Sequence, residues 1–172
     1  MDYILESKKV GIAATSSADI DALLTLENDL DNKRFIFPYS RERHIEAINR
    51  DDEKHLSVWE KESCTLVGFI LLAGLTNPNC SLEFRRIVIR DKGKGMGRDC
   101  LRLIKHYCFD VLQFHRLWLD VFEDNLRALT LYKSEGFRVD GKLREAVKQD
   151  QEYRTLLLLS ILEREYRSMG EG

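Results

Sequence analysis

The chain is poor in proline and in cysteine, and it carries almost no net charge. It has 2 prolines and 4 cysteines in 172 residues, and 27 Lys and Arg nearly balance 29 Asp and Glu, for a formal charge of −2. Low proline content excludes a collagen-like chain, and 44% hydrophobic with 33% charged residues excludes a disordered one. A near-neutral chain has no broad attraction for nucleic acid or anionic membranes. We therefore expect neither of these partners.

Sequence patterns for metal binding, secretion and membrane insertion are also missing. The cysteines form no C-x-x-C pair and the histidines form no metal motif, so we expect free thiols in a reducing cytosol and no metal. The charged first ten residues differ from a signal peptide. The longest uncharged stretch, residues 63–82, contains Gly68, Gly74 and Pro78 and is a poor membrane span. We expect one cytoplasmic domain over residues 1–172, with a single buried core.

Hydrophobic periodicity divides the chain into strands and helices. Strands are predicted over residues 8–14, 55–59, 64–75, 81–90, 115–122, 137–147 and 153–162. Helices are predicted after the N-caps Thr15–Ser17 and Ser40, over 96–113, and over 125–135, where Gly136 ends the helix. The order β-α-α-β-β-β-α-β-α-β-β predicts an α/β fold around a mixed sheet.

Apolar residues at helical spacing mark the helix faces that we expect to be buried. These residues are Ile20, Leu23, Leu24 and Leu26 in the first helix, Ile45 and Ile48 in the second, and Leu101, Ile104, Cys108 and Val111 in the third. Cys100 and Cys108 both lie on the third helix, near one face, which favours packing in the core. Between the first two helices, residues 31–39 form a loop rich in aromatic and basic residues.

A glycine-rich and basic loop connects the strand over 81–90 to the longest helix. Its residues are Arg90, Asp91, Lys92, Gly93, Lys94, Gly95, Met96, Gly97 and Arg98. Glycines let the main chain approach an anion, and the N–H groups of the first helical turn point toward it. The helix dipole and the basic side chains add positive potential, so a phosphate or pyrophosphate is the expected ligand. A glycine-rich helix start that binds nothing is the alternative.

The spacing of the glycines excludes two common phosphate-binding motifs. The dinucleotide motif G-x-G-x-x-G requires a glycine where this chain has Arg98. The P-loop motif G-x-x-x-x-G-K-[ST] does not occur in the chain. A nucleotide-binding protein is therefore a remote alternative.

Two segments in combination resemble a known enzyme family. Residues 92–97, KGKGMG, resemble the [R/Q]-x-x-G-x-[G/A] loop of the GNAT N-acetyltransferases, with Lys92 at the Arg or Gln position. Residues 125–137, NLRALTLYKSEGF, are similar to the family segment N-x-x-A-x-x-x-Y-x-x-x-G-F. The resemblance extends over essentially the whole chain and implies the GNAT-like acyl-CoA N-acyltransferase fold. Residues 37–44, 115–121 and 141–146 are most similar to the branch of ribosomal-protein alanine and spermidine N-acetyltransferases.

The resemblance implies acetyl-CoA as co-substrate and a primary amine as acceptor, acetylated by direct attack in a ternary complex. The pantetheine arm of acetyl-CoA would pair with the main chain of Ile87, Val88 and Ile89. The pyrophosphate would be held by the N–H groups of Gly93, Lys94, Gly95, Gly97 and Arg98. Lys92 would keep the charge of the family arginine without its two-pronged donor geometry, and Asn125 would orient the cofactor arm.

Acetyl transfer needs a proton for the departing thiolate and a base for the amine, whose pKa is about 10. Tyr132 matches the family tyrosine that donates to the thiolate, and packing of its ring in the core is the alternative. For Asn125 the alternative is an N-cap of the 125–135 helix. Glu83 is the predicted base, acting through water; Asp120 and Glu123 are competitors, and a solvated strand carboxylate is the alternative.

The sequence leaves the acceptor open among a peptide N-terminus, a polyamine and another small amine. Glu27, Asp29 and Asp31 would attract a polyamine, and nearby basic residues offset much of that attraction. A catalytically silent acyl-CoA sensor or interaction module is the alternative function, against which Tyr132 and Asn125 argue. The family resemblance is compatible with a homodimer.

Overall fold

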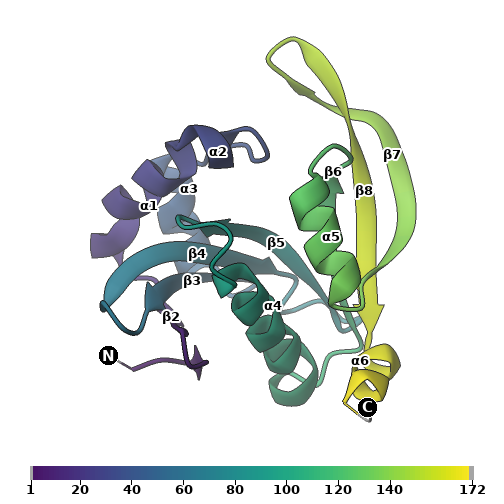
Figure 1. Cartoon of the computed structure of the whole chain (residues 1–172), viewed down its shortest axis with the longest axis horizontal. Helices are drawn as coiled ribbons and strands as arrows, with labels where there is room; N and C mark the ends of the chain where they lie inside the picture. Colours follow the sequence, from purple (N-terminus) through teal and green to yellow (C-terminus); the bar gives the residue numbers. More distant parts are fainter. Residues whose placement is uncertain (1, 171–172) are drawn as a thin grey trace.

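One eight-stranded sheet organises the computed structural model, which describes residues 2–170 (Figure 1). The strand order is β1-β2-β3-β4-β5-β6-β8-β7. β5 and β6 are parallel, and the other neighbouring pairs are antiparallel. The strands are β1 (Leu5–Glu6), β2 (Val10–Ala14), β3 (Glu53–Glu60), β4 (Thr65–Ala73), β5 (Ser81–Ile89), β6 (Arg116–Phe122), β7 (Arg138–Gln149) and β8 (Glu152–Leu162). The predicted mixed sheet is confirmed.

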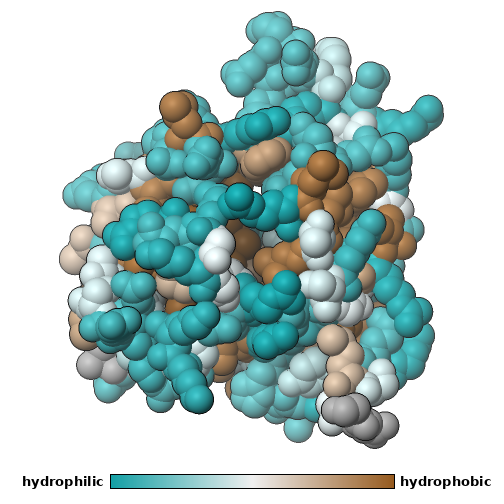
Figure 2. Space-filling model, viewed as in Figure 1, coloured by the Kyte–Doolittle hydropathy of each residue, from teal (hydrophilic) through white to brown (hydrophobic). Residues whose placement is uncertain are grey.

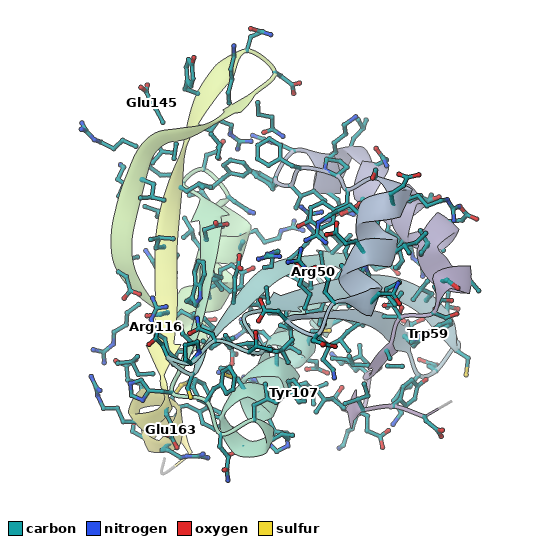
Figure 3. The ribbon with its side chains drawn as sticks, turned by 180° about the vertical axis from the view of Figure 1, so that it is seen from behind. Arg50, Trp59, Tyr107, Arg116, Glu145 and Glu163 are labelled. Carbon is teal, nitrogen blue, oxygen red and sulfur yellow. The ribbon has the colours of Figure 1, made fainter. Side chains whose placement is uncertain are left out.

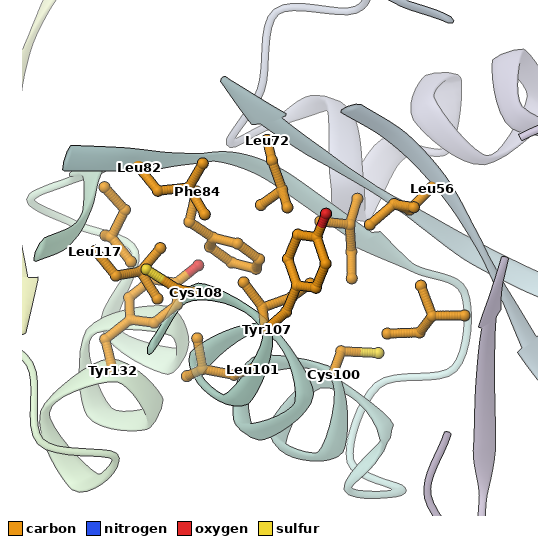
Figure 4. Packing of buried hydrophobic residues seen from close by; sticks show 14 of the residues in the cluster. Leu56, Leu72, Leu82, Phe84, Cys100, Leu101, Tyr107, Cys108, Leu117 and Tyr132 are labelled. Atoms are coloured by element: carbon orange, nitrogen blue, oxygen red, sulfur yellow. The ribbon is translucent and has the colours of Figure 1, made fainter. Parts of the chain in front are cut away.

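Helices cover both faces of the sheet. They are α1 (Ile20–Asn28), α2 (Leu30–Lys33), α3 (Arg41–Asn49), α4 (Met96–His106), α5 (Leu126–Ser134) and α6 (Glu163–Met169). Leu23 of α1 and Ala47 of α3 pack in one cluster with Phe69 of β4. On the opposite face, Figure 4 shows Leu101 of α4 and Leu72 of β4 in the larger core cluster, with Phe84 between them. Within residues 2–170, no helix is both long enough and apolar enough to cross a membrane.

The predicted order of elements is confirmed, and β1, α2 and α6 are added to it. The Ser40 side chain caps α3 by accepting the Arg43 N–H at 3.2 Å. Gly136 follows α5 with a left-handed φ of 94°. The two unpredicted helices are short: α2 has four residues and α6 has seven, most of them polar, so neither gives a clear hydrophobic period.

Two of the predicted buried helix positions are wrong. Ile45 is 40% exposed, because α3 turns His44 and Ala47 toward the sheet instead. Val111 is 54% exposed and lies in a π-helical turn, Tyr107–Val111, that continues α4. A π turn contains more residues than an α turn, so it rotates the end of the helix away from the apolar stripe of α4. The burial of Cys100 and Cys108 is as predicted.

β5 and β6 pair over a short stretch and then diverge. Their parallel ladder joins 81–83 to 116–118. In β5 an extra residue, Arg85, separates the residues that pair with Leu71 and Leu72 of β4. Such a β-bulge bends its strand. From Phe84 onward, this edge of β5 has no strand partner in the described part of the sheet, so its main-chain groups are free to bind a ligand.

β7 and β8 form a long hairpin that extends beyond the body of the protein. Figure 3 shows Glu145 far out along the hairpin and Arg116 near its base. Arg154 of β8 ties the hairpin to distant parts of the chain. Its guanidinium donates to the Arg34 carbonyl oxygen at 2.8 Å and to Oδ1 of Asp124 at 2.6 Å. The hairpin is therefore fixed against the segment that follows α2.

A continuous chain of buried polar side chains lies under α1 and α3. The hydroxyl oxygens of Ser57 and Thr15 are 2.9 Å apart, and that of Thr15 is 2.8 Å from Nδ1 of His55. Nε2 of His55 lies 2.8 Å from Nδ1 of His44, whose Nε2 lies 2.9 Å from Oε2 of Glu27. Every member of this polar chain is buried. His44 and His55 therefore have structural roles.

The titration of His55 gives a pH dependence to stability. Burial, followed by the neighbouring His44, lowers the pKa of His55 from 6.5 to about 3, so its ring stays neutral in the folded state. As the pH falls below about 6.5, the unfolded chain binds a proton that the folded chain does not, and the free energy of unfolding decreases until the pH reaches about 3. A glutamine at this position keeps a donor amide but cannot titrate.

We therefore predict that wild type loses more stability in acid than His55→Gln. Between about pH 7.5 and about pH 4.5 its free energy of unfolding should fall by about 3 kcal/mol more than that of the variant. Urea unfolding of both proteins across this range measures the difference. Two curves with the same pH dependence would contradict the assignment of a neutral, buried His55.

Candidate active site

A cavity of about 550 Å³ opens where β5 and β6 diverge. Its lining includes the predicted cofactor residues Ile87, Val88, Ile89, Gly97 and Asn125 together with Tyr132, which we call the glycine-loop wall. It also includes a set of apolar residues, which we call the aromatic wall: Phe35, Ile36, Phe37, Phe122, Val147 and Leu156. Figure 2 shows apolar surface inside the hollow between the α1–α2 region and α5, while polar residues surround it. The cavity thus connects the predicted cofactor residues to an apolar pocket.

The main chain of the glycine loop is shaped to receive an anion. Gly95 is the N-cap of α4 with a φ of 81°, and Gly93 has a φ of 83°. Within residues 2–170, no side chain caps this end of α4, so the N–H groups of its first turn are available. A Cβ atom at Gly97 would meet only Cδ2 of Leu131, at 3.9 Å, among the described atoms. Space and donors both fit the pyrophosphate that the sequence predicts.

The basic side chains of the loop differ in where they point. Lys92 lines the cavity and donates to Oδ1 of Asn32, and burial lowers its pKa. Lys94 pairs with Asp91 at 3.3 Å, outside the cavity lining. The guanidinium of Arg98 donates to Oγ of Ser134 at 2.9 Å and to Glu135 at 2.5 Å. Lys92 is thus the loop cation that faces the ligand space, and Arg98 offers its main chain.

Glu135 is a buried carboxylate that pairs with three basic side chains of α4, which together form the Glu135 cluster. Its carboxylate is 3.0 Å from Arg102 and 3.1 Å from Lys105, in addition to Arg98. Burial alone would raise the pKa of Glu135, but hydrogen bonds from Arg102, Arg98 and Lys105 lower it to about 2. Lys105 also donates to the main-chain oxygen of Glu135 at 2.8 Å. The cluster binds the end of α5 to α4.

Tyr132 and Asn125 of the α5 segment both reach the cavity. The Tyr132 ring is buried and packs 5.9 Å from the Phe137 ring, so the predicted alternative of core packing also holds. Burial, and then the negative charge of Asp120, raises the pKa of Tyr132, so its hydroxyl stays protonated at neutral pH. Asn125 accepts the Ala128 N–H at 3.3 Å, which confirms its role as N-cap.

Two carboxylates lie next to each other at the start of the divergence between β5 and β6. Asp120 lines the cavity, whereas Glu83 is absent from the lining among the described residues and accepts from Arg85 at 2.8 Å. Asp120 is exposed to the open cavity, but partial desolvation by the protein around it, and then the charge of Glu83, raises its pKa. The third candidate, Glu123, is half exposed and pairs with Lys142. Of the three, Asp120 is the carboxylate on the cavity surface.

The prediction that Glu27 attracts a polyamine is wrong. Glu27 is fully buried and is bonded to Arg86 and His44, so its charge is already neutralised inside the protein. Asp31 remains exposed and lines the cavity close to Lys92.

The aromatic wall is the part of the site that sequence reasoning did not assign. Its Phe35–Phe37 segment lies in the loop over residues 31–39, and the aromatic composition of that loop is the one sequence feature that could have pointed to an apolar wall. Val147 and Leu156 come from the β7–β8 hairpin, and no local pattern links them to the earlier segment. The Phe37 and Phe122 rings meet edge to face, with centroids 6.0 Å apart.

Known proteins provide an independent comparison. The model of the Acetyltransferase (GNAT) family matches residues 22–137. The chain is 28% identical to the spermidine N(1)-acetyltransferase of Vibrio cholerae, over 84% of this chain and 90% of that protein. It is 24% identical to the Escherichia coli spermidine N(1)-acetyltransferase, over 86% and 83%. The chain also matches a crystal structure of spermidine N-acetyltransferase from Vibrio cholerae in complex with CoA and spermine, and the match covers 94% of this chain and 99% of the other. Its TM-score is 0.84 at 24% identity, so the two share a fold.

The family match, the fold and the geometry of the cavity agree with one another. They confirm the predicted activity, transfer of the acetyl group of acetyl-CoA to a primary amine, and give no support to a silent sensor. The chain therefore belongs to the GNAT acetyltransferase family and is an acetyl-CoA-dependent N-acetyltransferase.

Proposed function

We propose that the acceptor is a polyamine of the spermidine type. The observation that carries the proposal is an apolar aromatic wall that leads to a carboxylate, Asp120, on the same cavity. Methylene groups suit the wall, while an ammonium group suits aromatic faces and the carboxylate. Two arginines on the lining, Arg85 and Arg86, are paired with Glu83 and Glu27, so their repulsion of a cation is reduced. The names of the two curated relatives support the same acceptor class.

The predicted residues of the donor site keep their proposed roles. The N–H groups of Gly93, Lys94, Gly95, Gly97 and Arg98 bind the pyrophosphate, and Lys92 adds the positive charge that faces the cavity. The free edge of β5 at Ile87–Ile89 pairs with the pantetheine arm as an added strand would. Asn125, besides capping α5, orients that arm at the cavity wall.

In the proposed mechanism, separate groups handle the two protons of the reaction. Asp120 and its neighbour Glu83 take the proton of the attacking ammonium through water, and the raised pKa of Asp120 strengthens it as a base. Tyr132, protonated at neutral pH, donates to the sulfur as the thioester C–S bond breaks. The freed amine attacks the thioester carbonyl carbon directly, so no acetylated enzyme forms.

We also propose that the enzyme acts in the cytoplasm and self-associates, beginning with a homodimer. The four free cysteines suit a reducing compartment. One solved structure of the Vibrio cholerae relative is described as dodecameric, which supports association of such chains.

A panel of acceptors tests the proposed substrate class. Spermidine, a diamine, a peptide with a free N-terminus and an amino sugar are each incubated with acetyl-CoA, and release of free thiol is followed. We expect kcat/KM for spermidine to exceed that for the peptide by roughly a hundredfold, because its ammonium groups can bind Asp120 and Asp31 while its methylene groups pack on the aromatic wall. A peptide as the best acceptor would contradict the proposal.

Gly97→Val tests the donor site. The new side chain would extend into the cavity without a clash in the protein, because the nearest described atom lies 3.9 Å from the Cβ position. We expect the Kd for acetyl-CoA to rise at least about tenfold, equal to about 1.4 kcal/mol, with an unchanged circular dichroism spectrum. Gly141→Val on β7 is the matched control, since a Cβ there has no neighbour within 4 Å among the described atoms. Unchanged affinity in a folded Gly97→Val protein would remove the pyrophosphate assignment.

Tyr132→Phe tests the proton donor. The change keeps the ring in its packing and deletes the hydroxyl, so kcat should fall by roughly ten- to a thousandfold while affinity for acetyl-CoA stays nearly constant. Single-turnover rates at saturating acceptor make the comparison, because slow product release would otherwise hide a chemical defect. Tyr107→Phe, at another buried tyrosine of the same core, is the control and should leave the rate unchanged. A wild-type single-turnover rate in Tyr132→Phe would exclude the acid role.

A further inference from the structure

Arg86 joins the cavity to the buried polar chain under α1 and α3. Its Nη1 donates to Oε1 of Glu27, and its Nη2 donates to the Phe37 carbonyl oxygen at 2.7 Å. Its guanidinium carbon lies 4.1 Å from the centroid of the Tyr39 ring. Arg86 also lines the cavity, next to the aromatic wall. One arginine of β5 therefore contacts two residues of the 35–39 segment, which supplies half of that wall.

Glu27 is the common partner of three structural elements. Its carboxylate accepts from Arg86 of β5, from Nε2 of His44 on α3 at 2.9 Å, and from the Tyr39 N–H at 3.1 Å. The Glu27 side chain has no exposed surface, and the Arg86 side chain is 8% exposed. A buried carboxylate with these donors is costly to disturb, because the loss of its charge leaves Arg86 without a counter-ion. The acetyl-transfer steps described above make no use of Glu27.

We propose that Glu27 is a positioning residue for acceptor binding. It fixes the 35–39 segment against β5 through Arg86 and the Tyr39 main chain, and it neutralises Arg86 at the edge of the cavity. The inference rests on the proposed function in one respect, since it assumes that the amine binds against the aromatic wall. If Glu27 has this role, the geometry and charge of the aromatic wall depend on a buried residue that lies outside the cavity lining.

Because Glu27 takes no part in the proposed proton transfers, its loss should affect acceptor binding and not the chemical step. The aromatic wall and Arg86 line the part of the cavity that we assign to the acceptor, whereas Tyr132 and Gly97 line the part that we assign to the donor. Loss of the Glu27 charge would loosen the aromatic wall and leave the charge of Arg86 unpaired next to the acceptor. Acceptor KM should therefore change, while donor affinity and kcat at saturating acceptor should not. A triamine should also be affected more than a monoamine, because it carries more positive charge.

Glu27→Gln in the full chain is the test, with Ser57→Ala as matched control. Ser57 lies at the far end of the same buried polar chain, so its loss lowers Tm without touching Arg86. In Glu27→Gln we expect the acceptor KM to rise roughly tenfold, and kcat and the Kd for acetyl-CoA to change by less than about twofold. Ser57→Ala should keep the wild-type KM. If Glu27→Gln fails to fold, Arg86→Lys replaces it as the test. This variant retains the charge but loses the second N–H donor, so it should also raise the acceptor KM.

Hydrogen exchange of the 35–39 amides gives a readout that needs no turnover. Exchange should become faster in Glu27→Gln, whose Tyr39 N–H has lost its charged acceptor, and stay unchanged in Ser57→Ala. If the acceptor panel selects an amine other than a polyamine, the proposed function fails and KM is measured with that amine. A KM rise there still supports positioning by Glu27. A wild-type KM for the best acceptor, or equal KM shifts in Glu27→Gln and Ser57→Ala, would overturn the inference.

Discussion

The short parallel pairing between β5 and β6 is the constraint on which the site depends. Past Glu83 the bulge at Arg85 bends β5 away, and the free strand edge, the cavity and the two walls all follow from that divergence. Continued pairing would give a more regular sheet, but it would use the main-chain groups that we propose for the donor. The sheet thus leaves main-chain groups at its centre without a strand partner, and the proposed pantetheine pairing would supply partners for them.

The local chemistry of the site could be predicted from sequence because it depends on short-range rules. A glycine with positive φ at position 95, an N-capping Asn125 and a terminating Gly136 each determine the conformation of neighbouring residues only. Helix caps and glycine turns of this kind have the same short spacing in any chain that contains them. Tyr132 then follows at two helical turns from the cap, which places it on the cavity together with Asn125.

The acceptor side could not be predicted in the same way. Phe35 and Leu156 meet at one cavity although more than a hundred residues separate them, and the contact depends on how the hairpin docks through Arg154. A hydrophobicity pattern also cannot identify a fully buried carboxylate. Glu27 looks like a surface residue at the end of an amphipathic helix until His44 and Arg86 are placed around it. Only the tertiary structure decides whether such a charge faces water or a partner.

The Glu135 cluster has a consequence for the entropy of catalysis. Arg98 begins in the loop that we propose for the pyrophosphate, and Glu135 follows the helix that carries Tyr132, so their bond ties the proposed donor site to the end of α5. The separation between the proposed donor anchor and the proposed acid is then restrained before any substrate binds. A long, flexible substrate loses its freedom on binding, whereas this part of the protein has less freedom to lose. Binding energy gained at the phosphate is then available to align the thioester rather than to order the enzyme.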